Sequence, residues 1–157
     1  MSMSIPRLVV ALVTVAALSG CGWSPPAPPP TSTAAECGPG PAADVVAAEI
    51  AMLPPAEWEE TERGHSADCR LNWVVVSSGH FDAPQQVLFF DGTEPVGSPT
   101  PEPRRFITVI PQGRSDAVVQ YQWRQGQDEP CCPTGIGTAR VTLEEGRLTI
   151  LDPIPGP

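Results

Sequence analysis

The residue with the clearest chemistry is Cys21, which follows an apolar run and the small residues of a Leu-Ser-Gly sequence. Residues 1–20 have the parts of a secretory signal, with Arg7 as the positive charge and an apolar run over 8–18. Small residues before a cleavage site let a peptidase reach the backbone, and the cysteine after them supplies a thiol. The spacing therefore predicts cleavage before Cys21 and lipidation of Cys21 by S-diacylglycerol and an N-acyl chain such as palmitate.

Such a modification predicts a lipid-anchored location. One acyl chain holds a protein to a bilayer only marginally, at about 0.8 kcal/mol per buried CH₂, whereas two or three chains hold it almost permanently. The apolar run over 8–18 is too short to cross about 30 Å of hydrocarbon. We therefore expect a protein anchored by lipid to the extracytoplasmic face of the cell membrane.

A proline-rich stretch follows the lipidation site. Residues 25–30 read PPAPPP, and consecutive prolines favour the extended polyproline II conformation. At about 3.1 Å per residue, some fifteen such residues reach roughly 45 Å. The expected organisation is a signal peptide over 1–20, a tether over 21–41 and a single domain over 42–157.

Four further cysteines are disulfide candidates, because an even number in an exported domain favours disulfides. They are Cys37, Cys69, Cys131 and Cys132. Three pairings are open. A bond between the adjacent Cys131 and Cys132 would close a strained eight-membered ring, so we expect each of them to pair with Cys37 or Cys69. Closing such long loops would stabilise the domain by about 3–5 kcal/mol in the chain-entropy model.

A metal site built from these cysteines with His65 or His80 is the rival interpretation. No C-x-x-C or H-x-x-x-H spacing supports it. A redox pair made by Cys131 and Cys132 has as little support. We expect no metal and no cofactor.

Catalytic patterns are weak. Ser77-Ser78-Gly79-His80 places serine near histidine without a G-x-S-x-G elbow, and His65 stands beside Ser66. Gly135-Ile136-Gly137 lacks a following helix and is expected to let the chain turn after Pro133. The sequence assigns no catalytic residue and favours a protein that is not an enzyme.

Two other groups of side chains, four glutamates and five aromatic residues, are candidate ligand-binding residues. The glutamates could bind a hard cation such as Ca²⁺, although a solvated acidic face fits them better. The aromatics could line an apolar pocket, although aromatic residues on strands more often belong to a core. The glutamates are Glu57, Glu59, Glu60 and Glu62, and the aromatics are Trp58, Trp73, Phe81, Phe106 and Trp123.

The elements that position these residues change type along the chain. Residues 41–53 predict a helix, with apolar residues at helical spacing and Pro54-Pro55 ending it. Six strands are predicted over 71–77, 86–91, 105–110, 117–124, 139–143 and 147–151, the last two joined as a hairpin. Without helical crossovers, the expected fold is α+β, with an N-terminal helix packed on a mainly antiparallel sheet of five to six strands, stapled by disulfides.

Composition excludes some partners. The chain has 18 acidic residues against nine basic ones, for a net charge of −9. An acidic surface repels nucleic acid and anionic headgroups, so neither is an expected partner. All nine basic residues are arginine, and much of the chain is Ala, Pro, Gly and Val, which is typical of a GC-rich genome such as that of an actinobacterium.

Several segments, in their order, resemble the LppP/LprE family of mycobacterial lipoproteins. They are QQVLFF over 85–90, PEP over 101–103, QYQWR over 120–124, CCPTG over 131–135 and LDPIP over 151–155. The resemblance covers about 42–155, and the CCP segment beside the aromatic strand is its most specific part. It implies a cell-envelope lipoprotein of an actinobacterium and brings no activity and no catalytic residues.

Three functional hypotheses follow. The favoured one is a non-enzymatic domain that binds an envelope protein or a glycan. The second is a carrier or sensor of a small apolar ligand, with the aromatics as its walls. The third is a hydrolase of wall or lipid material that uses His80 or His65.

Overall fold

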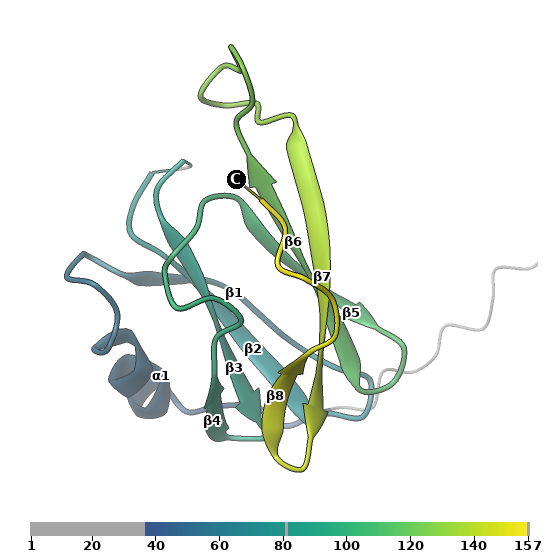
Figure 1. Ribbon diagram of the computed structural model, residues 1–157. Coiled ribbons are helices and arrows are strands. Elements are labelled where there is room, and N and C mark those ends of the chain that lie inside the picture. Colours follow the sequence, from purple (N-terminus) through teal and green to yellow (C-terminus); the bar gives the residue numbers. More distant parts are fainter. Residues whose placement is uncertain (1–36, 81, 157) are drawn as a thin grey trace, which may run out of the picture. The chain divides into compact units, whose positions relative to one another are not determined.

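The computed structural model describes residues 37–80 and 82–156, and nine elements lie within them (Figure 1). Cys21, the signal and most of the tether lie outside the described residues. None of the described helices is long and apolar enough to cross a membrane. The elements are the helix α1 (Ala43–Ile50) and the strands β1 (Glu59–His65), β2 (Leu71–Ser77), β3 (Gln85–Asp91), β4 (Glu94–Gly97), β5 (Ile107–Gln112), β6 (Asp116–Trp123), β7 (Gly135–Glu144) and β8 (Arg147–Ile150).

The strands form two four-stranded antiparallel sheets, in the orders β1-β2-β3-β4 and β5-β6-β7-β8. The prediction of an α+β fold, with a helix packed on one sheet of five to six strands, is therefore wrong. The described part of the chain is mostly β, and the one helix within it has eight residues. The predicted hairpin of the last two strands is confirmed, but strand patterns carry no signal for where one sheet ends and the next begins.

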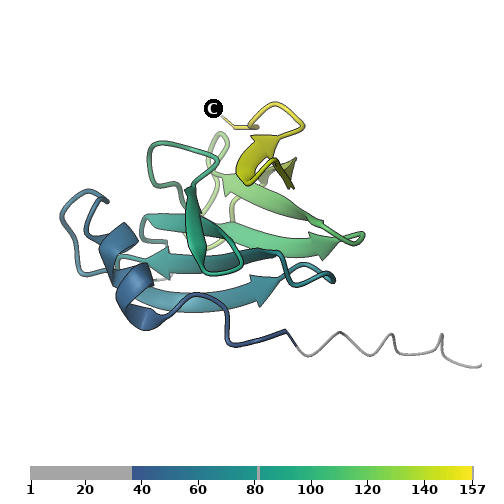
Figure 2. The same ribbon diagram turned by 90° about the horizontal axis from the view of Figure 1, so that it is seen from below.

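A shared core joins the two sheets into a β-sandwich, seen as two layers in Figure 2. Residues that alternate along the strands point into it, as expected for sheets packed face to face. The buried residues are Leu71, Trp73, Val75, Val87 and Phe89 from the first sheet and Ile107, Val109, Ala117, Val119, Tyr121, Ala139 and Val141 from the second.

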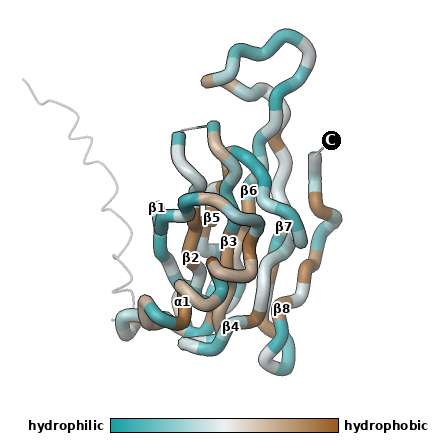
Figure 3. Tube along the Cα trace, turned by 90° about the vertical axis from the view of Figure 1, so that its left-hand side faces the viewer, coloured by the Kyte–Doolittle hydropathy of each residue, from teal (hydrophilic) through white to brown (hydrophobic). Residues whose placement is uncertain are grey.

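Strands β2 and β3 are buried on both faces, which explains their unbroken apolar sequence. The hydrophobic colour of these strands is visible in Figure 3. Their second face carries Val74, Val76, Leu88 and Phe90, which pack with Val46, the one fully buried residue of α1.

Sequence patterns missed β1 and β4. All but the last two residues of β1 are exposed, so the strand is stabilised by backbone pairing with β2 and shows no apolar alternation. Strand β4 is four residues long, contains Pro95 and pairs only with β3. Both are edge strands, and charged, short or proline-containing sequences are typical of such edges.

Candidate functional site

The structure joins Cys37 to Cys69 and Cys131 to Cys132. The predicted pairing, in which each of the adjacent cysteines reaches a distant one, is therefore wrong. Cys37 and Cys69 have Cα atoms 5.3 Å apart, within the ordinary range for a disulfide, because the chain entering α1 runs beside the turn after β1. Cys131 and Cys132 are both exposed in the loop between β6 and β7, where the backbone allows adjacent sulfurs to meet.

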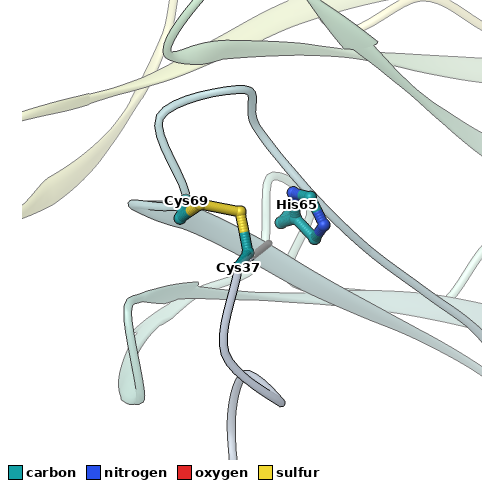
Figure 4. Close-up of side chains that lie close together, drawn as sticks. All are labelled: Cys37, His65 and Cys69. Carbon is teal, nitrogen blue, oxygen red and sulfur yellow. A yellow bond between two sulfur atoms is a disulfide. The ribbon is translucent and has the colours of Figure 1, made fainter. Parts of the chain in front are cut away.

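His65 lies beside the Cys37–Cys69 disulfide (Figure 4). A ring nitrogen of His65 and the two sulfurs lie within 4.8 Å of one another. The sulfurs are bonded to each other and are not thiolates, the form of cysteine that binds metals. The ring Nδ1 is 3.0 Å from the carbonyl of Ser66. In the oxidised protein this cluster is a disulfide with a neighbouring imidazole.

The serine and histidine candidates are held in structural hydrogen bonds. Ser66 is buried, and its hydroxyl donates to Asp68 at 2.6 Å and accepts from the amide of Leu71 at 3.1 Å. The Ser78 hydroxyl donates to the carbonyl of Pro84, and His80 is exposed. No described histidine is hydrogen-bonded to a serine hydroxyl.

The four glutamates do not assemble into a ligand cluster in the described chain. Glu59, Glu60 and Glu62 lie on β1, and Glu57 lies just before it. Glu60 pairs with Arg63 through two contacts of 2.8 Å, and this hydrogen bond is the main reason that the pKa of Glu60 is lowered.

The aromatic candidates separate into different environments. Trp73 is buried in the core against Phe89, and Trp58 packs beside α1 and donates to the carbonyl of Pro54. Phe81 lies outside the described residues. Of the described candidates, only Phe106 and Trp123 line the same pocket.

That pocket lies at the end of β6 and has a volume of about 290 Å³. Residues 104–106, which lead into β5, form one side, and residues 121–124 form the other. Hydrogen bonds hold the chain that leads into β5. The backbones of Gln85 and Arg104 pair, and the amide of Ile107 donates to the side-chain oxygen of Gln85. The amide of Gln122 donates to the carbonyl of Phe106. Phe106 has a φ of 54°, a left-handed conformation that is uncommon for a bulky side chain. The backbone thus places Arg105 and Phe106 beside Trp123.

The wall at Trp123 depends on a glycine of the neighbouring strand. Trp123 pairs with Gly135 across β6 and β7, and a Cβ atom at Gly135 would lie 2.4 Å from the indole Nε1. The same holds for Gly137, where a Cβ atom would lie 2.4 Å from the Cβ of Pro155 in the C-terminal segment. Gly135 and Gly137 are therefore part of β7, and the expected turn at these glycines is wrong.

Arg104 and Tyr121 form the inner end of the pocket. The guanidinium of Arg104 donates to the carbonyl of Pro155 at 2.5 Å, and its Cζ lies 5.2 Å from the centre of the Tyr121 ring, which allows a cation–π contact. Tyr121 is only 1% exposed, and its hydroxyl has no hydrogen-bond partner in the described chain. The Thr100 hydroxyl is near and lowers the pKa of Tyr121 slightly, but it donates to the carbonyl of Glu102 at 3.0 Å. Burial dominates and raises the pKa of Tyr121 to about 12, against the smaller opposing effect of Arg104.

Charge is distributed unevenly around this pocket. Every arginine except Arg7 is described, and four form ion pairs with carboxylates: Arg63, Arg70, Arg140 and Arg147. Of the other four, Arg104, Arg105 and Arg124 line the pocket, and only Arg114 lies elsewhere. Arg124 contributes weakly to lowering the pKa of Asp128 but makes no ion pair with it.

Asp128 fixes the loop that follows Arg124. Its carboxylate accepts from the amide of Gln125 at 2.7 Å, from the amide of Thr134 at 2.8 Å and from the Thr134 hydroxyl. The two backbone hydrogen bonds are the main cause of its lowered pKa. This loop extends beyond the sheets at the top of Figure 1 and holds the Cys131–Cys132 disulfide.

The three arginines were missed as site residues by the sequence reasoning. The available signal was the Arg104-Arg105 pair before Phe106, and Arg124 directly after Trp123, in an acidic chain with few basic residues. The two segments that line the pocket, 104–106 and 121–124, are far apart in the sequence; Arg104 and Gln122, for example, are 18 positions apart. The pairing of β5 with β6 brings the two segments together.

Comparison with known proteins agrees with the resemblance seen in the sequence. The model of the LppP/LprE lipoprotein family matches residues 63–146. Proteins named LppP from Mycobacterium bovis and Mycobacterium tuberculosis are 45% identical over 146 residues, which cover 87% of this chain and 83% of theirs. No solved structure matches the chain. The chain therefore belongs to the LppP/LprE family of lipoproteins.

Proposed function

We propose that this protein is a lipid-anchored envelope lipoprotein whose β-sandwich is a non-enzymatic binding domain, with the pocket between residues 104–106 and 121–124 as its binding site. The observation that carries the proposal is that three arginines line the pocket with Phe106 and Trp123 and have no carboxylate partner among the described residues. A pocket that combines apolar walls with a few converging polar groups is the usual form of a ligand site.

The anchor is proposed at Cys21, on the extracytoplasmic face of the cell membrane. Its support is the signal-like sequence before Cys21 together with membership in a lipoprotein family. A Cys21→Ala variant should lose the lipid and leave the membrane fraction. Unchanged partitioning of this variant into a detergent phase would contradict the anchor.

The other two hypotheses have weaker support. A store for an apolar ligand would not require three arginines in its lining, because a cation gains nothing by facing hydrocarbon. A hydrolase would require His65 or His80 beside a serine hydroxyl or a carboxylate. In the described chain, the Nδ1 of His65 lies against the carbonyl of Ser66, and the Ser66 hydroxyl is buried and donates to Asp68.

Photocrosslinking in intact cells tests the binding site directly. A benzoylphenylalanine replaces Arg105 in one strain and Arg114 in another, since both arginines are exposed and lack ion pairs within the described residues. The replacement at 105 leaves Arg104 and Arg124 in the pocket, so we expect weakened binding but still a defined adduct from position 105 that is absent from position 114. We also expect Arg124→Gln to reduce the adduct from position 105. The same adducts from both positions, or none from position 105, would contradict the proposed site.

A further inference from the structure

We infer that the pocket binds a small soluble oxyanion, a phosphate ester or carboxylate, that carries a flat ring. This inference rests on the proposed function, because it names the class of ligand for the same site. The guanidinium groups would hold the oxyanion, and the aromatic side chains would contact the ring.

The charge distribution supports the oxyanion. In a chain with net charge −9, arginines are few, and half of the described ones are neutralised by carboxylates. Three of the four that remain converge on one pocket, where their like charges repel one another. A bound anion removes this repulsion, and guanidinium groups bind phosphate and carboxylate through paired hydrogen bonds.

The position of Arg104 adds a second observation. Tyr121 lines the pocket, but its hydroxyl is fully buried and lies near Thr100, which is not part of the pocket lining, so this hydroxyl is not offered to a ligand. Arg104 is already held over the Tyr121 ring and against the Pro155 carbonyl, so little side-chain freedom is lost when its guanidinium meets an anion.

The aromatic side chains that line the pocket favour a ligand with a flat ring. The indole of Trp123 is half-buried and fixed against Gly135, and Phe106 faces the pocket from a strained backbone conformation. Strained, bulky residues are often found at ligand clamps, where the surrounding structure maintains them. Flat rings gain by stacking on such side chains.

The size of the site favours a small soluble molecule. Its volume of about 290 Å³ is just below the roughly 300–1,000 Å³ that is usual for ligand pockets. A ring with one oxyanion is of this scale. A lipid headgroup offers the same phosphate, but the chain as a whole is acidic, with a net charge of −9, and would be repelled by an anionic bilayer.

Calorimetric titration of the purified mature protein in a non-ionic detergent tests the inference. The probes are phenyl phosphate and benzoate, with inorganic phosphate as a charge without a ring and benzyl alcohol as a ring without a charge. We expect both aryl anions to bind more tightly than either control. Arg105→Gln and Arg124→Gln should each weaken phenyl phosphate binding about tenfold, consistent with loss of a charge-assisted hydrogen bond. The matched control Arg114→Gln makes the same change of charge away from the pocket and should bind as the parent does.

Several outcomes would overturn the inference. They include no binding of either aryl anion, equal loss in all three arginine variants, and inorganic phosphate binding as tightly as phenyl phosphate. Displacement of phenyl phosphate by phosphatidylglycerol vesicles would assign the site to a lipid headgroup and overturn the soluble ligand. Equal binding of benzyl alcohol would overturn the oxyanion but leave the pocket as a binding site. The proposed function itself fails only if position 105 gives no specific adduct in cells.

Discussion

The indole of Trp123 lies against the backbone of Gly135, its partner across strands β6 and β7. Trp73 has the same relation to Gly64 across β1 and β2, where a Cβ atom would lie 2.4 Å from the ring. Each sheet thus uses a glycine in a strand to seat a tryptophan, a known reason for glycine within a sheet. The two tryptophans differ in what they face, because Trp73 is buried in the core and Trp123 lines the pocket.

Gly135→Ala should therefore reduce binding more than stability. The new methyl group must displace the Trp123 indole, which is only half-buried, so less packing is lost than when a fully buried ring shifts. We expect a loss of less than about 1 kcal/mol in the free energy of unfolding, and a clear loss of phenyl phosphate affinity. The matched variant Gly64→Ala pushes on buried Trp73 and should cost about 1–3 kcal/mol. Urea denaturation and calorimetric titration of both variants provide the comparison, and parental affinity in Gly135→Ala would show that the indole forms no wall.

The two disulfides should contribute very differently to stability. Cys37–Cys69 joins positions 32 residues apart, and constraining a loop of that length contributes about 3–4 kcal/mol in the chain-entropy model. Cys131–Cys132 joins neighbours and constrains no loop. The double variant Cys37→Ser/Cys69→Ser should therefore lose that stability in urea denaturation, while Cys131→Ser/Cys132→Ser should lose less than about 1 kcal/mol. The reverse order of the two losses would contradict this assignment.

Tyr121 should make the protein less stable at alkaline pH. Burial raises its pKa from 10.0 to about 12 in the folded protein, so below pH 10 the phenol is neutral in both states. Above pH 10 the unfolded chain loses the proton first, which favours unfolding, and stability falls until the folded-state pKa is reached. Tyr121 is the only tyrosine, so ultraviolet absorbance of tyrosinate reports it alone.

The control for this effect is Tyr121→Phe, which has no phenol to ionise. Its stability should not show this alkaline decrease relative to the parent. Because the hydroxyl has no partner in the described chain, removing it should be neutral or slightly stabilising at pH 7. A Tyr121 titration near pH 10 in the folded protein, or a large loss of stability in Tyr121→Phe, would contradict the buried, unpaired hydroxyl.

The strands of the core were predictable from the sequence because their side chains carry the pattern. Trp73 to Val76 is an apolar run, and it lies in the strand β2 over the range that was predicted. Val119 and Tyr121 alternate with glutamines and are buried, as that alternation indicates. Strand β1 was missed because most of its residues are exposed and show no apolar alternation, while its pairing with β2 is made mainly by the backbone.

The disulfides and the pocket were not predictable, for a related reason. Which cysteines meet depends on the path of the backbone from Cys37 past β1 to Cys69, and local patterns do not encode that path. Likewise, Arg105 and Arg124 become neighbours only through the pairing of β5 with β6. The family resemblance, in contrast, was read correctly from short segments because their order and spacing are specific.

The most direct test of the account is a nuclear magnetic resonance titration that follows the indole N–H signals of the four tryptophans. Phenyl phosphate is added to the mature protein, and Trp123→Phe identifies the relevant signal. The account predicts that the Trp123 signal shifts in a saturable way, that the shift is lost in Arg105→Gln, and that the signals of core Trp73 and helix-side Trp58 stay in place. A Trp123 signal that does not move, or equal movement of Trp58, would contradict a binding site between residues 104–106 and 121–124.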